Sequence, residues 1–225
     1  MMRLLAITPL CVTDQELARR QQRYDRLAPP GVSVTLLNLG TGSEIPRAFD
    51  TAADIAASEA ALLQRFRSAD AGGYGDVDAF LPDCVLDPVV DLPNSGIATP
   101  VFGLLKLTAH FLLSLCATVG AVARNEPIAR ELDRKFASYG LGQLQGATSV
   151  LALSVEDISN DALWASAVST HLHTIDAEFV INGCSAVEVL TPAGRPGLID
   201  PTATALKLLG LSTAIEAAPR RQARL

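Results

Sequence analysis

An α/β fold with two pseudo-symmetric lobes is the fold that this sequence predicts, and three observations predict it. An apolar run that ends in a cysteine occurs at residues 76–84 and again one hundred residues later at 176–184. A Pro-led stretch that reads as a strand entering an apolar helix also occurs twice, at 99–103 and 195–200. Strand-like and helix-like segments alternate along the chain, which is typical of βαβ units around a mostly parallel sheet.

The first half of the chain contains clear start and stop signals. Pro9 ends the first strand, and the Pro-Pro-Gly run at 29–31 ends the first helix. A Gly-rich loop at 40–46 then suits an anionic ligand, with Ser43 as a predicted substrate contact, but it lacks the lysine of a P-loop. The expected elements are a strand at 3–8, a helix from Thr13 or Asp14 to about 27, a strand at 32–37, a helix from 50 or 51 to 68 and the first cysteine strand.

The second half continues the alternation. We expect a strand at 97–101, a helix at 104–115, a strand at 117–123, a helix at 126–138, a strand near 147–153, a helix from 160 to about 175 and the second cysteine strand. A helix-compatible segment follows each cysteine, at 85–90 and 185–190. We predict one lobe from residues 1–98 and 200–225, which carries Cys84, and a second from 99–199, which carries Cys184.

Composition bounds the class of protein. The 225 residues are 49% hydrophobic and 19% charged, which is enough to bury a core without a metal or disulfide. The net charge of −6 argues against a nucleic-acid surface, and the arginines after residue 219 read as a solvated tail. The short apolar start reads as a core strand rather than a signal peptide, and the apolar stretch at 111–123 is too short to span a bilayer. We therefore expect a cytoplasmic protein without a membrane partner.

Two of the four cysteines are candidates for chemistry. No C-x-x-C spacing occurs, so we expect free thiols and no zinc site. Cys84 and Cys184 both follow a strand, and ligands of such sheets bind beyond the carboxyl ends of the strands. A cysteine at the start of a helix has a lowered pKa, so one thiolate can remove a proton while the opposite thiol delivers one. We expect the N–H groups of Val85 and Ser185 and the hydroxyls of Ser185 and Thr118 to hold an enolate-like oxygen.

Four motifs carry a family resemblance: DCVLDP at 83–88, TPVFG at 99–103, NGCS at 182–185 and LIDPT at 198–202. Together they resemble the aspartate/glutamate/hydantoin racemase superfamily, most nearly its hydantoin racemase branch. The resemblance implies a cofactor-independent racemase or epimerase of a small amino acid or hydantoin-like substrate, with the active site between the lobes. It implies Cys84 and Cys184 as the acid/base pair, no cofactor or metal, and a homo-oligomer.

Departures from the family pattern change the expected substrate contacts. The first loop reads Thr8-Pro-Leu-Cys11 instead of Asn-Pro-Asn-Thr, which leaves Thr8 as its hydrogen-bond donor to the substrate. Lys106 stands where an acid is common, and Asp83 would raise the pKa of the adjacent thiol if it faced the site. The alternatives are a decarboxylase or cis-trans isomerase of a small dicarboxylate on the same site, and a ligand-binding protein without turnover.

Other reactive side chains have simpler interpretations. Cys11 and Cys116 read as core filling, since cysteine is among the most buried residue types. His110 reads as a core or pocket-edge residue, and Trp164 as packing between its helix and the sheet. Two histidines at 171 and 173 would lie on different faces of one helix, which disfavours a metal pair.

Overall fold

The computed structural model describes residues 1–40, 45–115, 118–142, 146–189 and 196–217. In chain order, the elements are β1 (Met2–Ile7), α1 (Asp14–Leu27), β2 (Val32–Leu37), α2 (Ala52–Ser68), the helical turn η1 (Ala69–Gly73), β3 (Ala79–Pro82), α3 (Leu104–Ser114), β4 (Val119–Ala123), α4 (Glu126–Ser138), β5 (Ser149–Val150), the helical turn η2 (Glu156–Ser159), α5 (Asp161–Leu172), β6 (Phe179–Asn182), β7 (Gly197–Ile199) and α6 (Pro201–Ala217).

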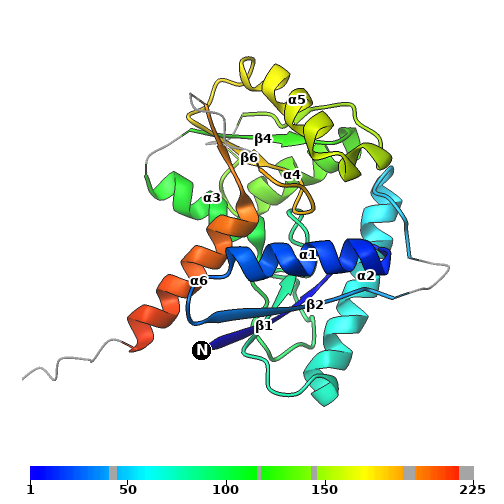
Figure 1. Cartoon of the computed structure of the whole chain (residues 1–225), viewed down its shortest axis with the longest axis vertical. Coiled ribbons are helices and arrows are strands. Elements are labelled where there is room, and N and C mark those ends of the chain that lie inside the picture. The colour runs from blue at the N-terminus through cyan, green and yellow to red at the C-terminus, as the bar shows by residue number, and fades with distance from the viewer. Residues whose placement is uncertain (41–44, 116–117, 143–145, 190–195, 218–225) are drawn as a thin grey trace, which may run out of the picture.

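Two parallel sheets form the two halves of the molecule (Figure 1). One has the strand order β2-β1-β3, and the other has the order β5-β4-β6-β7. All strand pairs are parallel, and β4 is buried along its whole length, as expected for strands covered by helices on both faces. The predicted α/β fold with two lobes is confirmed. None of the helices in the described ranges is long and apolar enough to cross a membrane.

The two sheets repeat one another in register. Ile7 at the end of β1 pairs with Pro82, and Val122 in β4 pairs with Asn182, so each partner stands two residues before its cysteine. The fourth strand differs between the halves, because β7 pairs fully with β6 whereas Val101 makes a single bridge to β3. The predicted strand at 97–101 is therefore wrong. Pro100 has no N–H to donate, which limits this ladder to the bonds around Phe80.

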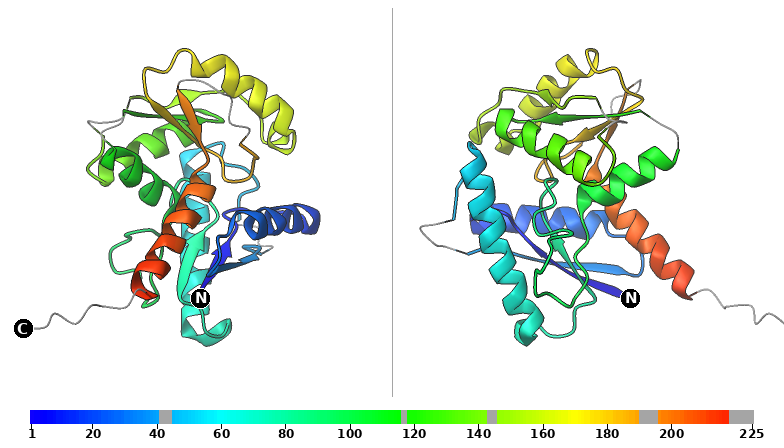
Figure 2. Two further views of the ribbon diagram at one scale, coloured as in Figure 1. Left: turned by 60° about the vertical axis from the view of Figure 1, so that its left-hand side comes forward. Right: turned by 180° about the vertical axis from the view of Figure 1, so that it is seen from behind.

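Helices cross between the two halves. Leu206 and Leu209 of α6, the last helix, pack with Leu4 and Leu81 of the first sheet. Figure 2 shows α6 running from the second half down along the first. Several side chains of α3 pack with β4 of the second sheet, namely Leu105, Ala109 and Leu112. The predicted lobe boundaries near residues 99 and 200 place α3 with the second sheet and α6 with the first, as this packing does. The boundaries themselves stay a prediction.

The segment after each cysteine is not helical. Residues 85–90 form buried turns, with positive φ at Asp87 (48°) and Val89 (69°), and residues 185–189 form turns and irregular loop. The predicted helices at 85–90 and 185–190 are therefore wrong within the described residues, which end at 189. In the loop after Cys84, the N–H groups of Asp87 and Val90 donate to the carbonyls of Cys84 and Asp87, and the N–H of Val89 donates to the Glu59 carboxylate.

Asp87 makes the central side-chain hydrogen bonds of the loop after Cys84. Its carboxylate accepts hydrogen bonds from the N–H groups of Leu105 (3.0 Å) and Lys106 (2.7 Å) and from the Tyr139 hydroxyl (2.9 Å), so it caps α3. A Cβ at Gly103 would lie 2.3 Å from this carboxylate, which explains the glycine. Burial raises the pKa of Asp87 to about 6, against the opposing effect of these three donors.

Replacing Asp87 by alanine is expected to destabilise the fold. The Asp87→Ala variant leaves two buried N–H groups and a tyrosine hydroxyl without their acceptor, so the free energy of unfolding should fall by about 3 kcal/mol in urea denaturation. The matched control is Asp91→Ala, because Asp91 also has a positive φ (55°) but only an exposed ion pair with Lys106. An equal loss in both variants would contradict a capping role for Asp87.

Candidate active site

Both predicted catalytic cysteines line one small cavity of about 70 Å³. Cys84 follows β3 and Cys184 follows β6, so each half of the molecule contributes one thiol from the carboxyl end of a strand. Cys84 is buried and Cys184 is half-buried. Val85 and Ser185 also line the cavity, whose remaining wall is mostly apolar. The structure thus brings together four of the seven site residues predicted from the sequence.

A hydrogen bond joins the two cysteine loops. The Ser185 hydroxyl donates to the carbonyl oxygen of Asp83 at 2.9 Å, and both residues are buried. The second loop is also held from its own side, because the Asn182 amide donates to the Cys184 carbonyl at 2.7 Å. Trp164 packs its helix against the sheet as predicted, and its indole N–H donates to Asn182 at 2.9 Å. The position of each thiol therefore depends on contacts made by its loop.

The electrostatic surroundings of the two thiols differ. Burial raises the pKa of both thiols. A backbone N–H two residues after each cysteine acts in the opposite direction, that of Leu86 on Cys84 and that of Ala186 on Cys184. Asp83 and Asp87 raise the pKa of Cys84 further. For Cys184, Arg20 and Arg23 of α1 lower the pKa, while Asp83 raises it. The expectation of helix-start thiolates with a lowered pKa is wrong, because neither cysteine begins a helix.

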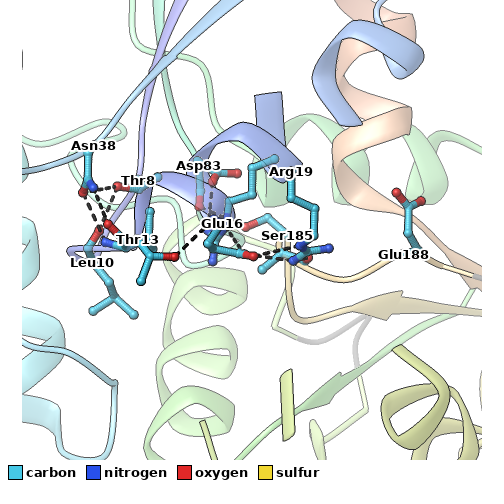
Figure 3. Close-up of polar contacts among 12 residues, drawn as sticks. Thr8, Leu10, Thr13, Glu16, Arg19, Asn38, Asp83, Ser185 and Glu188 are labelled. Carbon is cyan, nitrogen blue, oxygen red and sulfur yellow. Dashed lines mark hydrogen bonds and ion pairs between the residues drawn. The ribbon is translucent and has the colours of Figure 1, made fainter. Parts of the chain in front are cut away.

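The carboxylate of Asp83 is bound by two side chains of α1. It accepts hydrogen bonds from the Tyr24 hydroxyl at 2.8 Å and from Arg20 at 3.0 Å. These contacts partly neutralise the charge that the sequence placed beside Cys84. Figure 3 shows this side of the site, with Asp83, Glu16, Arg19 and Ser185 close together.

Two arginines of the cavity were missed from the sequence. Arg20 reaches it from α1, and Arg124 reaches it from the end of β4. The Arg124 guanidinium is buried and donates to the carbonyl of Phe49 at 3.0 Å and to the carboxylate of Asp50 at 2.8 Å. Its place directly after a buried apolar strand, like that of the cysteines, was a readable signal. Arg20 gave no such signal in the sequence, since the direction of its side chain depends on its hydrogen bond to Asp83, which lies far from it in the sequence.

Thr8 is a structural residue rather than a substrate contact. It is fully buried, and its hydroxyl donates to the carbonyl of Leu10 at 2.8 Å and accepts from the N–H of Leu39 at 3.1 Å (Figure 3). Pro9 and Leu10 line the cavity in its place. The prediction for Thr8 is therefore corrected, because its hydroxyl is already used to fix the loop after β1.

The prediction for Thr118 is also wrong. Thr118 lies before β4, and its hydroxyl accepts from the N–H of Glu178, just before β6. Since β4 and β6 are parallel, this is the end of the sheet opposite to Cys184. Ser43 lies outside the described residues.

The remaining reactive side chains do not join the cavity. Cys11 is half-buried and does not line it, while Cys116 lies outside the described residues. His110 is exposed, with Nδ1 2.8 Å from the carbonyl oxygen of Lys106, so the expectation of a core or pocket-edge histidine is wrong. Within the described ranges, no three His, Cys, Asp or Glu side chains form a group that could hold a metal ion.

Gly183 is expected to be required for the position of Cys184. A Cβ there would lie 2.1 Å from the carbonyl oxygen of Val122, so the Gly183→Ala variant must displace the loop or the strand. We expect a loss of about 2 kcal/mol or more in unfolding free energy. The matched control is Gly146→Ala, where no atom of the described residues lies within 4 Å of the new Cβ. Similar unfolding curves for the two variants would contradict this close approach.

Comparison with solved structures places this fold among racemases. Allantoin racemase from Klebsiella pneumoniae is similar with a TM-score of 0.77 and 18% identity, over 96% of this chain and 89% of that one. Allantoin racemase from Pseudomonas fluorescens gives 0.76 and 15% over 96% and 92%, and Picrophilus torridus aspartate racemase gives 0.59 and 12% over 95% of each chain. The comparison with curated proteins found no match. The sequence profile of the Asp/Glu/hydantoin racemase family matches residues 15–209, which is most of the chain. This protein therefore belongs to that family.

Proposed function

We propose that this protein is a cofactor-independent racemase or epimerase of a small carbon acid, with Cys84 and Cys184 as its acid/base pair. One observation carries the proposal: thiols from the two repeated halves line one small cavity. Membership of a racemase family supports the class of reaction. The cavity volume of about 70 Å³ supports a small substrate, either an amino acid or a hydantoin-like ring.

The proposed reaction transfers two protons. The thiolate of one cysteine removes the proton from the substrate carbon, and the electron pair of that C–H bond moves into the adjacent carbonyl. The thiol of the other cysteine then protonates the opposite face, which inverts the centre and exchanges the protonation states of the two cysteines. For the direction in which Cys184 starts as the base, the nearby charges support the assignment. Arg20 and Arg23 favour the Cys184 thiolate, Asp87 favours the protonated form of Cys84, and Asp83 disfavours both thiolates.

Stabilisation of the enolate oxygen falls to groups beside the thiols. Within the described residues, the N–H groups of Val85 and Ser185 donate to no acceptor, so they remain available to an oxyanion. Arg124 contributes a buried positive charge to the same cavity. Ser185 already donates its hydroxyl to Asp83, so we assign its backbone N–H rather than its hydroxyl to the substrate.

Isotope exchange tests the two-thiol reaction. In deuterated water, over a panel of amino acids, hydantoins and substituted malonates, we expect the wild type to exchange the α-hydrogen with loss of optical activity. The Cys84→Ala and Cys184→Ala variants should each lose racemisation by about 100-fold or more, because each removes a general acid or base. Thermal unfolding of both variants provides the control that the fold is retained.

Other outcomes of the same experiment identify other chemistry. Release of carbon dioxide with deuterium fixed on one face would indicate a decarboxylase, and conversion of a cis to a trans dicarboxylate would indicate an isomerase. A carboxylate that binds in the cavity without turnover would indicate a binding protein. Racemisation that survives either substitution would contradict the paired roles of Cys84 and Cys184.

The rate of racemisation is expected to rise with pH. The reaction needs one thiolate, and burial raises the pKa of both thiols, so the thiolate is the minor form at neutral pH. Its fraction, and with it kcat/KM, should rise by about tenfold per pH unit between pH 7 and the lower pKa of the pair. Measurement of kcat/KM between pH 6.5 and pH 9 checks this. A level profile would show that the working thiol already ionises below that range.

A further inference from the structure

A surface groove lies directly outside the cysteine cavity. The groove has a volume of about 730 Å³ and follows α1 and the loop after β1. It shares four wall residues with the cavity, namely Leu10, Arg20, Val155 and Ile158. These four side chains separate the two spaces, so their movement would connect the groove to Cys84 and Cys184.

The lining of the groove is positively charged although the protein is not. Among its described lining residues are three arginines, Arg19, Arg20 and Arg47, and one carboxylate, that of Glu16, so these four side chains carry a net charge of +2. The whole chain has a net charge of −6. Glu16 binds both Arg19 and Arg20, and Asp161 lies near enough to Arg19 to raise its pKa. Arg47 is exposed, and among the described residues it forms no ion pair.

Arg20 stands at the wall between the two spaces. Its guanidinium donates to Glu16 at 2.7 Å, on the groove side, and to Asp83 at 3.0 Å, on the cavity side. Glu16 lines the groove alone and Asp83 lines the cavity alone, whereas Arg20 lines both. Only 11% of its side chain is exposed. Both carboxylates bind the same guanidinium, so an anion that passes the wall must replace one of them as the partner of Arg20.

We propose that this groove is the entrance to the cysteine cavity and that it selects a substrate with a net negative charge, such as a carboxylate. An anion approaching the molecule meets Arg47 first and then Arg20 at the wall, and the local positive field raises its concentration there. The field does nothing for a neutral ring. Where it names the substrate, the inference rests on the proposed function. It narrows the proposed substrates to those with a net negative charge, such as an acidic amino acid, and excludes a neutral ring or a zwitterion of zero net charge.

The charge selection can be measured without turnover, by alkylating the two thiols with iodoacetate and iodoacetamide. These reagents are similar in size and differ in charge, so the ratio of their rates cancels the thiolate fraction of each thiol. Burial disfavours the charged reagent in every variant alike, so comparing the ratio between variants at the same thiol cancels that cost. Mass spectrometry of peptides reports the ratio separately for Cys84 and Cys184, relative to N-acetylcysteine amide. We expect the ratio to favour iodoacetate, to fall about twofold in Arg47→Gln and about fivefold in Arg47→Glu, and to lose the preference in 0.5 M salt.

The matched control is Arg3→Gln, which makes the same change in net charge at the amino end of β1, away from the groove. We expect this variant to keep the wild-type ratio. A ratio that does not respond to Arg47 or to salt, or that falls equally in Arg3→Gln, would overturn the proposal. Because alkylation needs no racemisation, failure of the isotope-exchange experiment alone would remove the proposed reaction and leave the anion entrance standing.

Discussion

The hydrogen bond from the Ser185 hydroxyl to the Asp83 carbonyl is the contact on which the site depends, because it ties together loops from the two repeated halves. Asp83 is fixed by every polar group that it has. Its N–H donates to Ile7 of the first sheet, its carboxylate binds Arg20 and Tyr24, and its carbonyl binds the second loop. Proton transfer between a carbon and two sulfurs requires fixed distances, and a residue held in three directions supplies them.

Helix α1 extends this connection along the whole second loop. Arg19, Arg23 and Arg26 lie on one face of the helix, since residues three and four apart are neighbours on its surface. Arg19 donates to the carbonyl of Ala186, Arg26 pairs with Glu188, and Arg23 pairs with Asp200 at the start of α6. Arg23 is buried, so breaking its pair would leave an uncompensated charge and cost far more than an exposed pair. A helix of the first half thus holds the thiol of the second.

The sequence predicted those features that depend on local pattern. Alternation and capping located the strands of both sheets and α4 at its observed bounds, and the repeated cysteine strands predicted the pairing of halves. The turns after Cys84 were missed because their cause is Asp87 binding the start of α3, a contact that no short window contains. Thr118 was misplaced although the direction of its strand was readable, since a residue before a parallel strand cannot reach the carboxyl end.

Burial of both thiols changes the starting state that the sequence predicted, in which a cysteine at the start of a helix has a lowered pKa. The proposed reaction needs one thiolate and one thiol that exchange roles, so two thiolates at neutral pH would leave no acid to protonate the second face. Here burial raises the pKa of both, while Arg20 and Arg23 act on Cys184 and two carboxylates act on Cys84 in the opposite sense. Asp87 and Arg20, which make contacts that fix the loops, are also among the groups that separate the two thiols electrostatically. Geometry and protonation state are therefore set by the same contacts, so a substitution at either residue changes both together.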